Sequence, residues 1–343
     1  MTQYVGLDVA DEETSVCVVD QEGAVLVEAK VASEPAAIAA FIRARAPHVA
    51  KVGFETGPLA VWHWHELRQL GLPVACLDAR HAQAALSCQI NKTDRNDAFG
   101  LAQLVRMGWY REVQVKSYGS HYVRALLRVR SLLVRSRCDF ENQVRGLLKI
   151  FGLRLGKTGR KGFAKRVAEL LENQPAVEAL VAALLKVRQT IVEQIATLDA
   201  DLRRMAKGSA TVRRLTTVPG IGPITALAFV SAVDDPSRFR KASSVGAYFG
   251  LTPRRYQSGE IDRPGRVSKA GDGMVRRCLF EAAVVLLTRV AGWCPLKAWG
   301  TRLIKRIGLH RAVVAVARKL AVILHCIWVD GTEFWWTRAA TKA

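Results

Sequence analysis

The sequence has few of the features that would place a protein outside the cell or in a membrane. Its seven cysteines are odd in number, scattered and form no C-x-x-C pair, which argues against a disulfide framework or a zinc cluster and fits a reducing cytosol. The first residues contain no basic segment followed by an apolar stretch, so no signal peptide is expected. The most apolar late stretch, Val313 to Val329, contains Arg318 and Lys319 and is too short and too charged to span a bilayer. We therefore expect no membrane partner.

Acidic residues are also scarce. The 343 residues include 51 Lys and Arg against 30 Asp and Glu, for a formal net charge of +21. Such an excess indicates a polyanionic partner, and without a membrane this partner is nucleic acid. The charge is uneven, because residues 1–100 hold 8 basic and 13 acidic residues and the rest of the chain carries +26. An acidic N-terminal region thus precedes a strongly basic body.

The N-terminal region, residues 1–117, has the pattern of an α/β domain. Three β-rich runs separated by short turns predict an antiparallel meander, at residues 4–9, 14–20 and 24–27. Strands then alternate with helices, with strands expected at 51–55 and 73–77 and helices at 35–46 and 58–71. This order predicts a mixed sheet.

The middle region, residues 118–207, has the pattern of two long helices. Apolar residues recur there at three- and four-residue spacing, as on the buried face of a helix. They are Leu133, Phe140, Val144, Leu147 and Phe151, then Val177, Leu180, Leu184, Val187, Ile191, Leu198 and Leu202. A Gly-rich basic connector, residues 152–166, joins the two helices. We expect a protruding, coiled-coil-like hairpin that pairs with a second copy; the alternative is that both helices are walls of a compact helical domain.

The C-terminal region, residues 208–343, is expected to be mainly helical, with a polar basic loop at 252–273. Its segment VPGIGP, residues 218–223, predicts a turn between two helices. In helix-hairpin-helix modules such a turn offers backbone N–H groups to a phosphate, which would assign nucleic-acid contacts to Gly220 and Gly222. The alternative is a tight interhelical turn with only a packing role.

Four carboxylates of the N-terminal region stand at strand ends and at a helix start. Asp8 lies in the first strand, Glu55 ends a later one, and Asp94 and Asp97 share one face at the start of a helix. Carboxylates in such places can converge on hard divalent cations, and two metal ions can clamp the attacking and leaving oxygens of a phosphoryl transfer. Taken singly, each acid could instead be a turn residue, a surface residue or a helix-capping residue.

These motifs resemble those of one known family. The segments GLD (6–8), ETG (55–57) and KTDRNDA (92–98) resemble the DEDD transposases of the one-ten family of bacterial insertion sequences, which are bridge-RNA-guided recombinases. The segment FGLTPRRYQSG (249–259) is similar to the C-terminal signature of that family, and VSKAG (267–271) to its companion motif. The resemblance covers both ends of the chain in the expected order and is weakest in the middle helices.

The resemblance implies a RuvC-like, ribonuclease-H-type N-terminal domain in which Asp8, Glu55, Asp94 and Asp97 form the acidic tetrad that binds Mg²⁺. It implies that Ser258 is the nucleophile. It also implies composite sites between protomers, hence a homodimer and, on two DNAs, a tetramer. A bridge RNA and a location in the bacterial cytoplasm at the nucleoid are implied in the same way.

A serine nucleophile is chemically reasonable in this segment. A hydroxyl that attacks a phosphodiester must lose its proton, and the charge on the phosphate must be neutralised. Arg254 and Arg255 could supply guanidinium groups for this purpose. A covalent phosphoserine would conserve the bond energy, so that strands could be rejoined without ATP. From spacing alone Ser258 would be a turn residue and Ser268 an equal candidate, and only the resemblance favours Ser258.

Basic residues are concentrated in two segments. Residues 120–170 hold 13 Lys and Arg against 3 acids, and residues 250–311 hold 13 against 4. Stripes of this kind suit a phosphate backbone, although some are only solvated faces. The side chains and turn residues expected to contact nucleic acid are Arg124, Arg128, Arg135, Gly220, Gly222, Arg254, Arg255, Lys269, Arg276 and Arg277. Tyr248 and Tyr256 could stack on bases or simply pack, and the segment WHWH, residues 62–65, is interpreted as structural.

The leading hypothesis is a recombinase of an insertion sequence that cuts and rejoins donor and target double-stranded DNA. The alternative is a metal-dependent, junction-resolving endonuclease in which water is the nucleophile. A non-enzymatic alternative is a nucleic-acid-binding scaffold with a decayed acidic site. An actin-like ATPase also begins with a Gly-x-Asp strand, but it would need further phosphate loops, and the segment DGT at 330–332 lies too close to the C-terminus to be one.

Overall fold

The chain forms two compact units. The computed structural model describes residues 1–87, 91–159 and 162–336, and its contacts divide the chain into Met1–Lys116 and Ser117–Ala343. Cys88 and residues 160–161 of the basic connector lie outside the described residues. The expected boundary near residue 207 stays a prediction, because the helical hairpin and the C-terminal region belong to the same unit.

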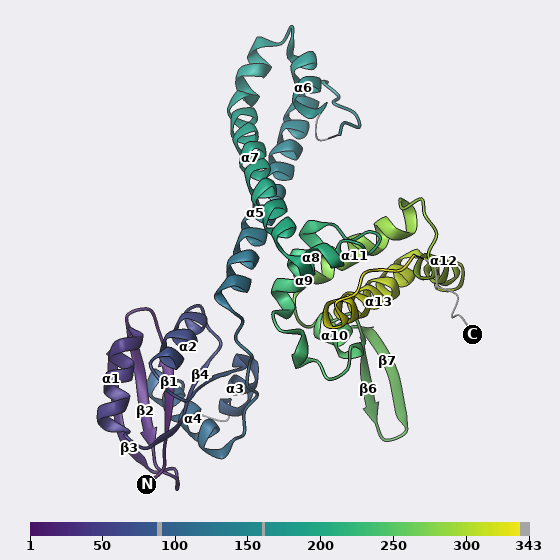
Figure 1. Ribbon diagram of the computed structural model, residues 1–343. Coiled ribbons are helices and arrows are strands. Elements are labelled where there is room, and N and C mark those ends of the chain that lie inside the picture. Colours follow the sequence, from purple (N-terminus) through teal and green to yellow (C-terminus); the bar gives the residue numbers. More distant parts are fainter. Residues whose placement is uncertain (88–90, 160–161, 337–343) are drawn as a thin grey trace, which may run out of the picture. The chain divides into compact units, whose positions relative to one another are not determined.

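The first unit is a five-stranded mixed sheet with helices, as predicted (Figure 1). Its strands are β1 (Gln3–Val9), β2 (Glu13–Val19), β3 (Val25–Ala32), β4 (Val49–Glu55) and β5 (Val74–Leu77). Its helices are α1 (Pro35–Arg45), α2 (Ala60–Gln69), α3 (Ala79–Leu86) and α4 (Asp94–Met107). The strand order is β3-β2-β1-β4-β5, with β2 antiparallel to β1 and β3, and with β4 parallel to β1 and β5. The predicted meander is therefore correct, and its third strand is longer than expected.

The two faces of this sheet are covered by different helices. Val5 and Leu7 of β1 pack with α1 and α2, so the alternation of a strand turns Gly6 and Asp8 to the opposite face, where α4 lies. Gly6 has no side chain for a reason: a Cβ there would lie 2.0 Å from the carbonyl oxygen of Ala98 in α4. This close approach holds the start of α4 against β1, two residues from Asp8.

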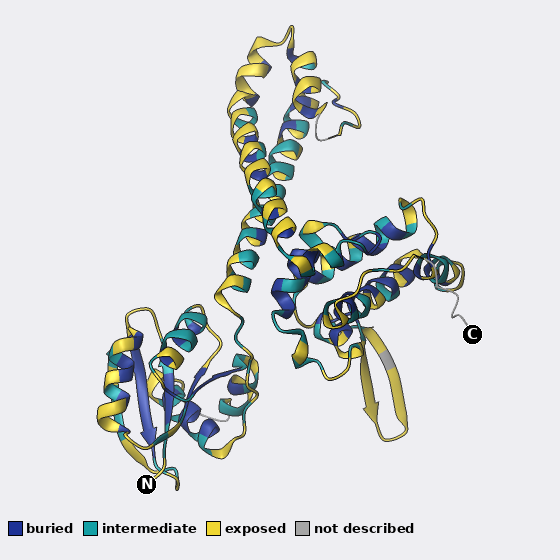
Figure 2. Ribbon diagram, in the orientation of Figure 1, coloured by how far each residue is buried: buried dark blue, intermediate teal, exposed yellow. Residues whose placement is uncertain are grey.

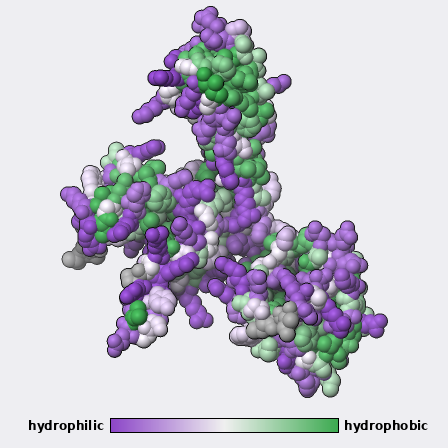
Figure 3. All heavy atoms as spheres, turned by 180° about the vertical axis from the view of Figure 1, so that it is seen from behind, coloured by the Kyte–Doolittle hydropathy of each residue, from purple (hydrophilic) through white to green (hydrophobic). Residues whose placement is uncertain are grey.

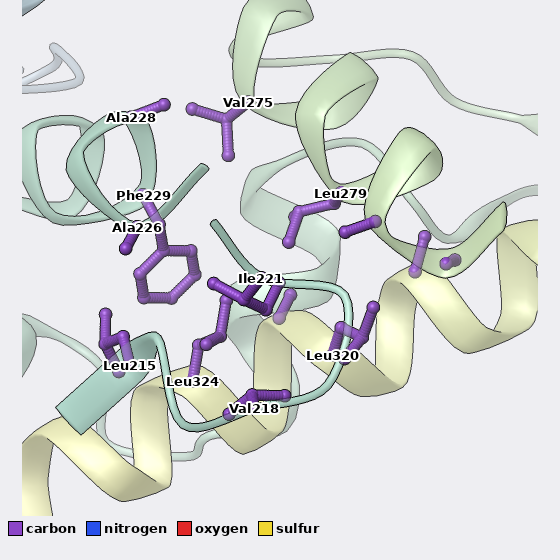
Figure 4. Packing of buried hydrophobic residues seen from close by; sticks show 14 of the residues in the cluster. Leu215, Val218, Ile221, Ala226, Ala228, Phe229, Val275, Leu279, Leu320 and Leu324 are labelled. Carbon is purple, nitrogen blue, oxygen red and sulfur yellow. The ribbon is translucent and has the colours of Figure 1, made fainter. Parts of the chain in front are cut away.

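The second unit is mainly helical. Its helices are α5 (Tyr118–Ile150), α6 (Phe163–Leu171), α7 (Pro175–Gly208), α8 (Ala210–Leu215), α9 (Pro223–Val233), the short η2 (Pro236–Arg238), α10 (Ser243–Tyr248), α11 (Gly273–Thr288), α12 (Pro295–Ile307) and α13 (Leu309–Asp330). Helices α8, α9, α11 and α13 supply most of the main apolar core, in which Phe229, Leu279 and Leu324 are completely buried (Figure 4).

Helices α5 and α7 form the predicted hairpin, and their end is closed by α6 (Figure 1). The α6 end has a small apolar core of its own, which includes Val144, Phe163 and Val181. Between the two cores the hairpin is held by ion pairs: Arg188, only 4% exposed, donates to Glu141, and Arg130 binds Asp199. In the face shown in Figure 3, hydrophobic residues gather toward the α6 end of the hairpin, and hydrophilic ones line much of its length.

The segment expected to be a loop at 252–273 contains a β-hairpin instead. Strands β6 (Pro253–Ser258) and β7 (Ile261–Val267) pair antiparallel, with Ser258 opposite Ile261. All residues of β6 are exposed (Figure 2). The hairpin was missed because neither strand has a buried face, so the apolar alternation that indicates a strand is lacking.

Helix α13 corrects one expectation, because by length and composition it could cross a membrane, whereas its apolar stretch was expected to be too short and too charged. Half of its most apolar segment is nevertheless buried inside the unit. Val316, Leu320 and Leu324 lie in the main core. Within the described residues α13 therefore packs as the central helix of the second unit.

Candidate active site

Three acidic side chains of the first unit meet because of strand register and helix placement. Strands β1 and β4 are parallel with Gly6 beside Gly53 and Leu7 beside Phe54, so Asp8 and Glu55 follow on the same face at the carboxyl ends of both strands. Asp97 lies in the first turn of α4, which begins after the N-cap Thr93 and is held against β1 at Gly6. Residues far apart in the sequence thus meet at one edge of the sheet.

These acids line a pocket of about 320 Å³. Asp8, Glu55 and Asp97 share it with Lys92. The walls are completed by residues of α3, its C-cap and α4, namely Ala79, Gln83, Leu86, Ser87 and Leu101. The Nζ atom of Lys92 lies 3.9 Å from a carboxylate oxygen of Asp97. The pocket therefore combines several negative charges with one flexible cation.

Burial and mutual repulsion make ionisation unfavourable in this pocket. Burial, followed by the charges of Asp97, Asp94 and Glu55, raises the pKa of Asp8 from 3.8 to about 6. Burial and the charge of Asp97 also raise the pKa of Glu55, and Lys92 partly opposes both shifts. Carboxylates that repel one another at the edge of a sheet are a mark of functional sites, because a bound cation relieves the repulsion.

Asp94 stands slightly apart from the other three. It does not line the pocket, its side chain is 67% exposed, and a carboxylate oxygen lies 3.6 Å from Nζ of Lys30. Its charge still contributes to the raised pKa of Asp8. The structure therefore brings Asp8, Glu55 and Asp97 together and leaves Asp94 at their margin.

The donor chemistry fits a hard divalent cation, because every candidate ligand is a carboxylate oxygen. As they stand, no three His, Cys, Asp or Glu side chains among the described residues are close enough to hold a metal ion. Electrostatics supplies a reason, since Asp8, Glu55 and Asp97 repel one another and lysines lie beside Asp94 and Asp97.

Ser258 occupies a very different environment in the second unit. It is the last residue of β6 and precedes Gly259, whose φ of +55° forms part of the turn. Its side chain is exposed, and no described group makes a hydrogen bond to its hydroxyl. Arg255, expected to bind phosphate, instead donates two hydrogen bonds, of 2.9 and 2.6 Å, to the carboxylate of Asp262.

The companion motif folds back against the base of this hairpin. The amide of Ser268 donates to the carbonyl of Thr252, and Arg254 makes a long hydrogen bond of 3.4 Å to the carbonyl of Ser268. Lys269 is exposed and has a positive φ of +54°, a rare conformation for a residue other than glycine. These contacts give Ser268 a local structural role that Ser258 lacks.

Besides Arg254 and Arg255, two more of the arginines expected to bind nucleic acid have internal partners. Arg124 is 12% exposed and pairs with Asp272 at 2.5 Å, and Arg276 donates to the carbonyls of Phe249 and Ala270. Their guanidinium groups hold α11 to its neighbours. The nucleic-acid role expected for Arg124 and Arg276 stays a prediction; the helical spacing did not reveal the acid opposite Arg124.

Other arginines of the same set are free for a ligand. Arg128 and Arg135 lie on the exposed side of α5, and Arg277 is exposed on α11. They make no ion pair among the described residues. These three fit the expected phosphate-binding role better than Arg124 and Arg276 do.

The two glycines of the VPGIGP turn differ. Gly220 has a φ of +86°, and a Cβ there would lie 2.5 Å from the carbonyl oxygen of Ala282 in α11, so it serves packing. Gly222 is the N-cap of α9 and has open space where a Cβ would be. Of the two, only Gly222 leaves room for a phosphate.

Sequence reasoning missed Lys92 and Gln83 as lining residues of the acidic pocket. The position of Lys92 two residues before Asp94 was a usable signal, whereas Gln83 lies on a helix whose place in the fold was not foreseen. The structural interpretation of the WHWH segment agrees with the structure. His63 is buried between the carbonyls of Leu59 and Ser33, with ring nitrogens 3.1 and 2.7 Å from them.

Comparison with known proteins identifies the family. A transposase profile of the DEDD type of IS110 elements matches residues 5–152, and the profile of the transposase IS116/IS110/IS902 family matches residues 212–296. The chain is 31% identical over 326 residues to a probable family 20 transposase of Pseudomonas aeruginosa, covering 93% of this chain and 95% of the relative. It is 29% identical over 336 residues to the transposase for insertion sequence element IS1111A of Coxiella burnetii, covering 94% and 88%.

A third relative, the transposase for insertion sequence element IS1328 of Yersinia enterocolitica, is 30% identical and is covered over 74% of its length. The two profiles fall on the two ends of the chain that carry the DEDD and serine motifs. The chain belongs to the IS110 family of insertion-sequence transposases.

Proposed function

We propose that this transposase cuts and rejoins DNA strands through a covalent phosphoserine at Ser258, with divalent metal ions held by Asp8, Glu55, Asp97 and Asp94. The observation that carries the proposal is the acidic pocket, where Asp8, Glu55 and Asp97 from three separate elements face one space. The raised pKa values of Asp8 and Glu55 are the expected consequence of a site built for a cation.

The N-terminal unit fits a RuvC-like fold. Its strand order β3-β2-β1-β4-β5, with β2 antiparallel to its neighbours, and its acids at the ends of β1 and β4 and at the start of α4 support this assignment. The proposed cofactor is Mg²⁺, because carboxylates are the ligands that this ion prefers. When bound, the metal would act as a Lewis acid on the phosphodiester and stabilise its developing charge.

The proposed serine step is a transesterification. The Oγ atom of Ser258 forms a bond to phosphorus, the bond from phosphorus to the leaving sugar oxygen breaks, and the hydroxyl proton of the serine ends on that oxygen. The reverse reaction, by attack of another sugar hydroxyl, rejoins a strand and frees Ser258. Both directions conserve the number of phosphate ester bonds, so no ATP is needed.

The partners proposed are donor and target double-stranded DNA and a bridge RNA. The positive charge of the chain after residue 100, +26, supports binding of more than one nucleic acid. Because no described group makes a hydrogen bond to the hydroxyl of Ser258, we propose that the acidic pocket of another protomer completes the serine site. A homodimer, and a tetramer on two DNAs, would follow from such composite sites.

A second candidate is a metal-dependent endonuclease with water as the nucleophile. It is favoured by the same observation, that no described group makes a hydrogen bond to the hydroxyl of Ser258. In that case the acidic pocket would activate water, and the second unit would only bind DNA. The two candidates differ in one product, the covalent protein–DNA adduct.

The test is to incubate the full chain and its copurified RNA with labelled DNA that spans an end of the insertion element, and to look for adducts on denaturing gels. The native chain and the control Ser268→Ala should form the adduct, and Ser258→Ala should not. Cleavage without an adduct in the native chain would favour the water mechanism. Sequencing of the copurified RNA tests the bridge RNA separately, and failure to copurify any RNA would contradict that part.

A further inference from the structure

A second cavity lies within the second unit. It is a groove of about 700 Å³ between α10, the base of the β6–β7 hairpin, α12 and α13. This is within the size range of ligand-binding pockets. Its lining residues are Ser243, Leu251, Pro253, Val267, Trp299, His310, Arg311, Val314, Ala315, Arg318, Lys319 and Val322.

The floor of the groove is apolar and aromatic. Val314, Ala315 and Val322 lie along one side of α13, and the half-buried indole of Trp299 comes from α12. Leu251, at the start of the serine signature, is buried beside them. Such a surface favours an occupant that has a flat or apolar part to remove from water.

The rim of the groove is cationic. Arg311, Arg318 and Lys319 are exposed, and none of the described residues that line the groove has a carboxylate. No ion pair with another described residue engages these three side chains, in contrast to Arg124 and Arg255, which each bind an aspartate. The rim therefore offers uncompensated positive charge.

The position of Arg318 is supported by a glycine. A Cβ at Gly246 of α10 would lie 2.9 Å from Cγ of Arg318. The lack of a side chain at Gly246, which is buried, lets the aliphatic part of the arginine lie against α10. The guanidinium is then directed by packing rather than by an acidic partner.

The groove also adjoins the hairpin that carries the proposed nucleophile. Pro253 and Val267 are paired across the base of this hairpin and both line the groove. Ser258 ends the strand that begins at Pro253. A nucleic-acid strand that reaches Ser258 can therefore continue along β6 toward the groove.

We propose that this groove binds a single-stranded nucleic-acid segment, with a base against Trp299 and Val314 and with phosphates at Arg311, Arg318 and Lys319. Unpaired bases have apolar faces and an anionic backbone, and proteins bind them by combining aromatic surface with uncompensated cations. The inference rests on the proposed function in so far as strand exchange at Ser258 supplies unpaired strands. An acidic amphipathic protein segment is the competing occupant.

The first test measures binding of fluorescein-labelled oligothymidylate to the full-length chain as salt is varied. The double variant Arg311→Gln/Lys319→Gln should lower the salt dependence by about 0.7 for each lost phosphate contact, and the affinity by roughly tenfold. Lys305→Gln/Arg306→Gln is the matched control, since it removes two exposed cations of α12 that do not line the groove. Equal effects of the two double variants would contradict the groove.

The second test fills the groove without changing its charge. Ala315→Trp should weaken oligothymidylate binding by roughly tenfold, since the base can no longer reach the floor, while binding of the corresponding duplex is retained and shows that the variant is folded. If Ala315→Trp binds oligothymidylate as the native chain does, the proposal is wrong. The proposal is also wrong if polyglutamate binds the native chain and loses this binding in Ala315→Trp, while oligothymidylate binds both chains equally.

The serine variant separates this inference from the proposed function. Ser258→Ala should bind oligothymidylate as tightly as the native chain does, although it forms no covalent adduct. If the native chain binds the strand at the groove but forms no adduct, the serine mechanism is wrong and the proposal for the groove still holds. A native chain that forms the adduct while the groove variants bind normally would overturn the groove alone.

Discussion

The two units differ in whether their charged side chains have partners of opposite charge. In the first unit Asp8, Glu55 and Asp97 are gathered in one pocket with only Lys92 to balance them. In the second unit several arginines of the basic body are matched with carboxylates or carbonyls, as Arg124 is with Asp272. The formal net charges of residues 1–100 and 101–343, −5 and +26, do not reveal this difference.

The comparison separates charges that serve function from charges that serve stability. A group that the fold leaves unbalanced raises the free energy of the folded state and is expected to be balanced by a ligand. A group with an internal partner contributes to the packing and is costly to remove. Substitutions in the acidic pocket should therefore reduce activity without unfolding the protein, and substitutions of the paired arginines should do the reverse.

The largest effect is expected for Glu55→Gln. Loss of one anionic ligand should reduce DNA cleavage by about a hundredfold to a thousandfold, the range seen when one charge-stabilising group of an active site is removed. Cleavage would be measured with saturating Mg²⁺ and labelled element-end DNA. Glu12→Gln, an exposed residue between β1 and β2, is the control and should cleave normally; equal activity of both variants would remove the acidic pocket from the mechanism.

The next largest effect is expected for Arg124→Ala. Asp272 would keep its hydrogen bonds from the amides of Met274 and Val275 but lose its buried cation, at a cost of about 3 kcal/mol in the free energy of unfolding. Denaturant titration measures this. Arg128→Ala, exposed on the same helix, should change stability by less than about 0.5 kcal/mol and should instead weaken DNA binding. If Arg124→Ala weakened DNA binding at unchanged stability, the distinction between the two kinds of arginine would fail.

A smaller effect on stability is expected for Gly220→Ala. The new methyl group meets the carbonyl of Ala282, and the residue must keep a positive φ, so a loss of about 1–3 kcal/mol is expected. Gly222→Ala meets no atom within 4 Å and should be close to neutral in thermal unfolding. Stability lost equally in both variants would contradict the packing role assigned to Gly220.

The smallest effect, of opposite sign, is expected for Asp8→Asn in the absence of metal. The pKa of Asp8 is raised to about 6, so the ionised carboxylate is less favourable in the folded state than in the unfolded chain. Asp8→Asn should therefore raise the Tm slightly above about pH 6, in EDTA. This gain should shrink as the pH falls through that value and disappear below the unfolded pKa of 3.8.

The exposed control Asp11→Asn should not change the Tm over the same pH range. Added Mg²⁺ should reverse the order, by stabilising the native chain more than the variant, because ligands stabilise the state that binds them. A native chain that is the more stable one at neutral pH without metal would mean that the acidic pocket is not electrostatically strained.

The spacing of apolar residues was sufficient to predict the helices and strands that have a regular apolar face. The meander, the parallel strand that ends at Glu55 and the helical hairpin were predicted because burial on one side imposes a period of two or of about 3.6 residues. The hairpin of β6 and β7 was missed because its strands are exposed and show no such period. The acidic residues were found because each lies in a short contiguous segment of the sequence, and because these segments resemble the motifs of a known family.

The sequence was thus enough for the strands and most helices of the first unit, α3 excepted, for the basic character of the rest and for naming the candidate acids. Which charges remain free was settled only by tertiary contacts. The partner of Arg124 lies 148 residues further along the chain, and the approach of α4 to Gly6 places Asp97, but not Asp94, on the pocket. Electrostatic free energy depends on distance and burial in space, and neither quantity is a function of spacing along the chain.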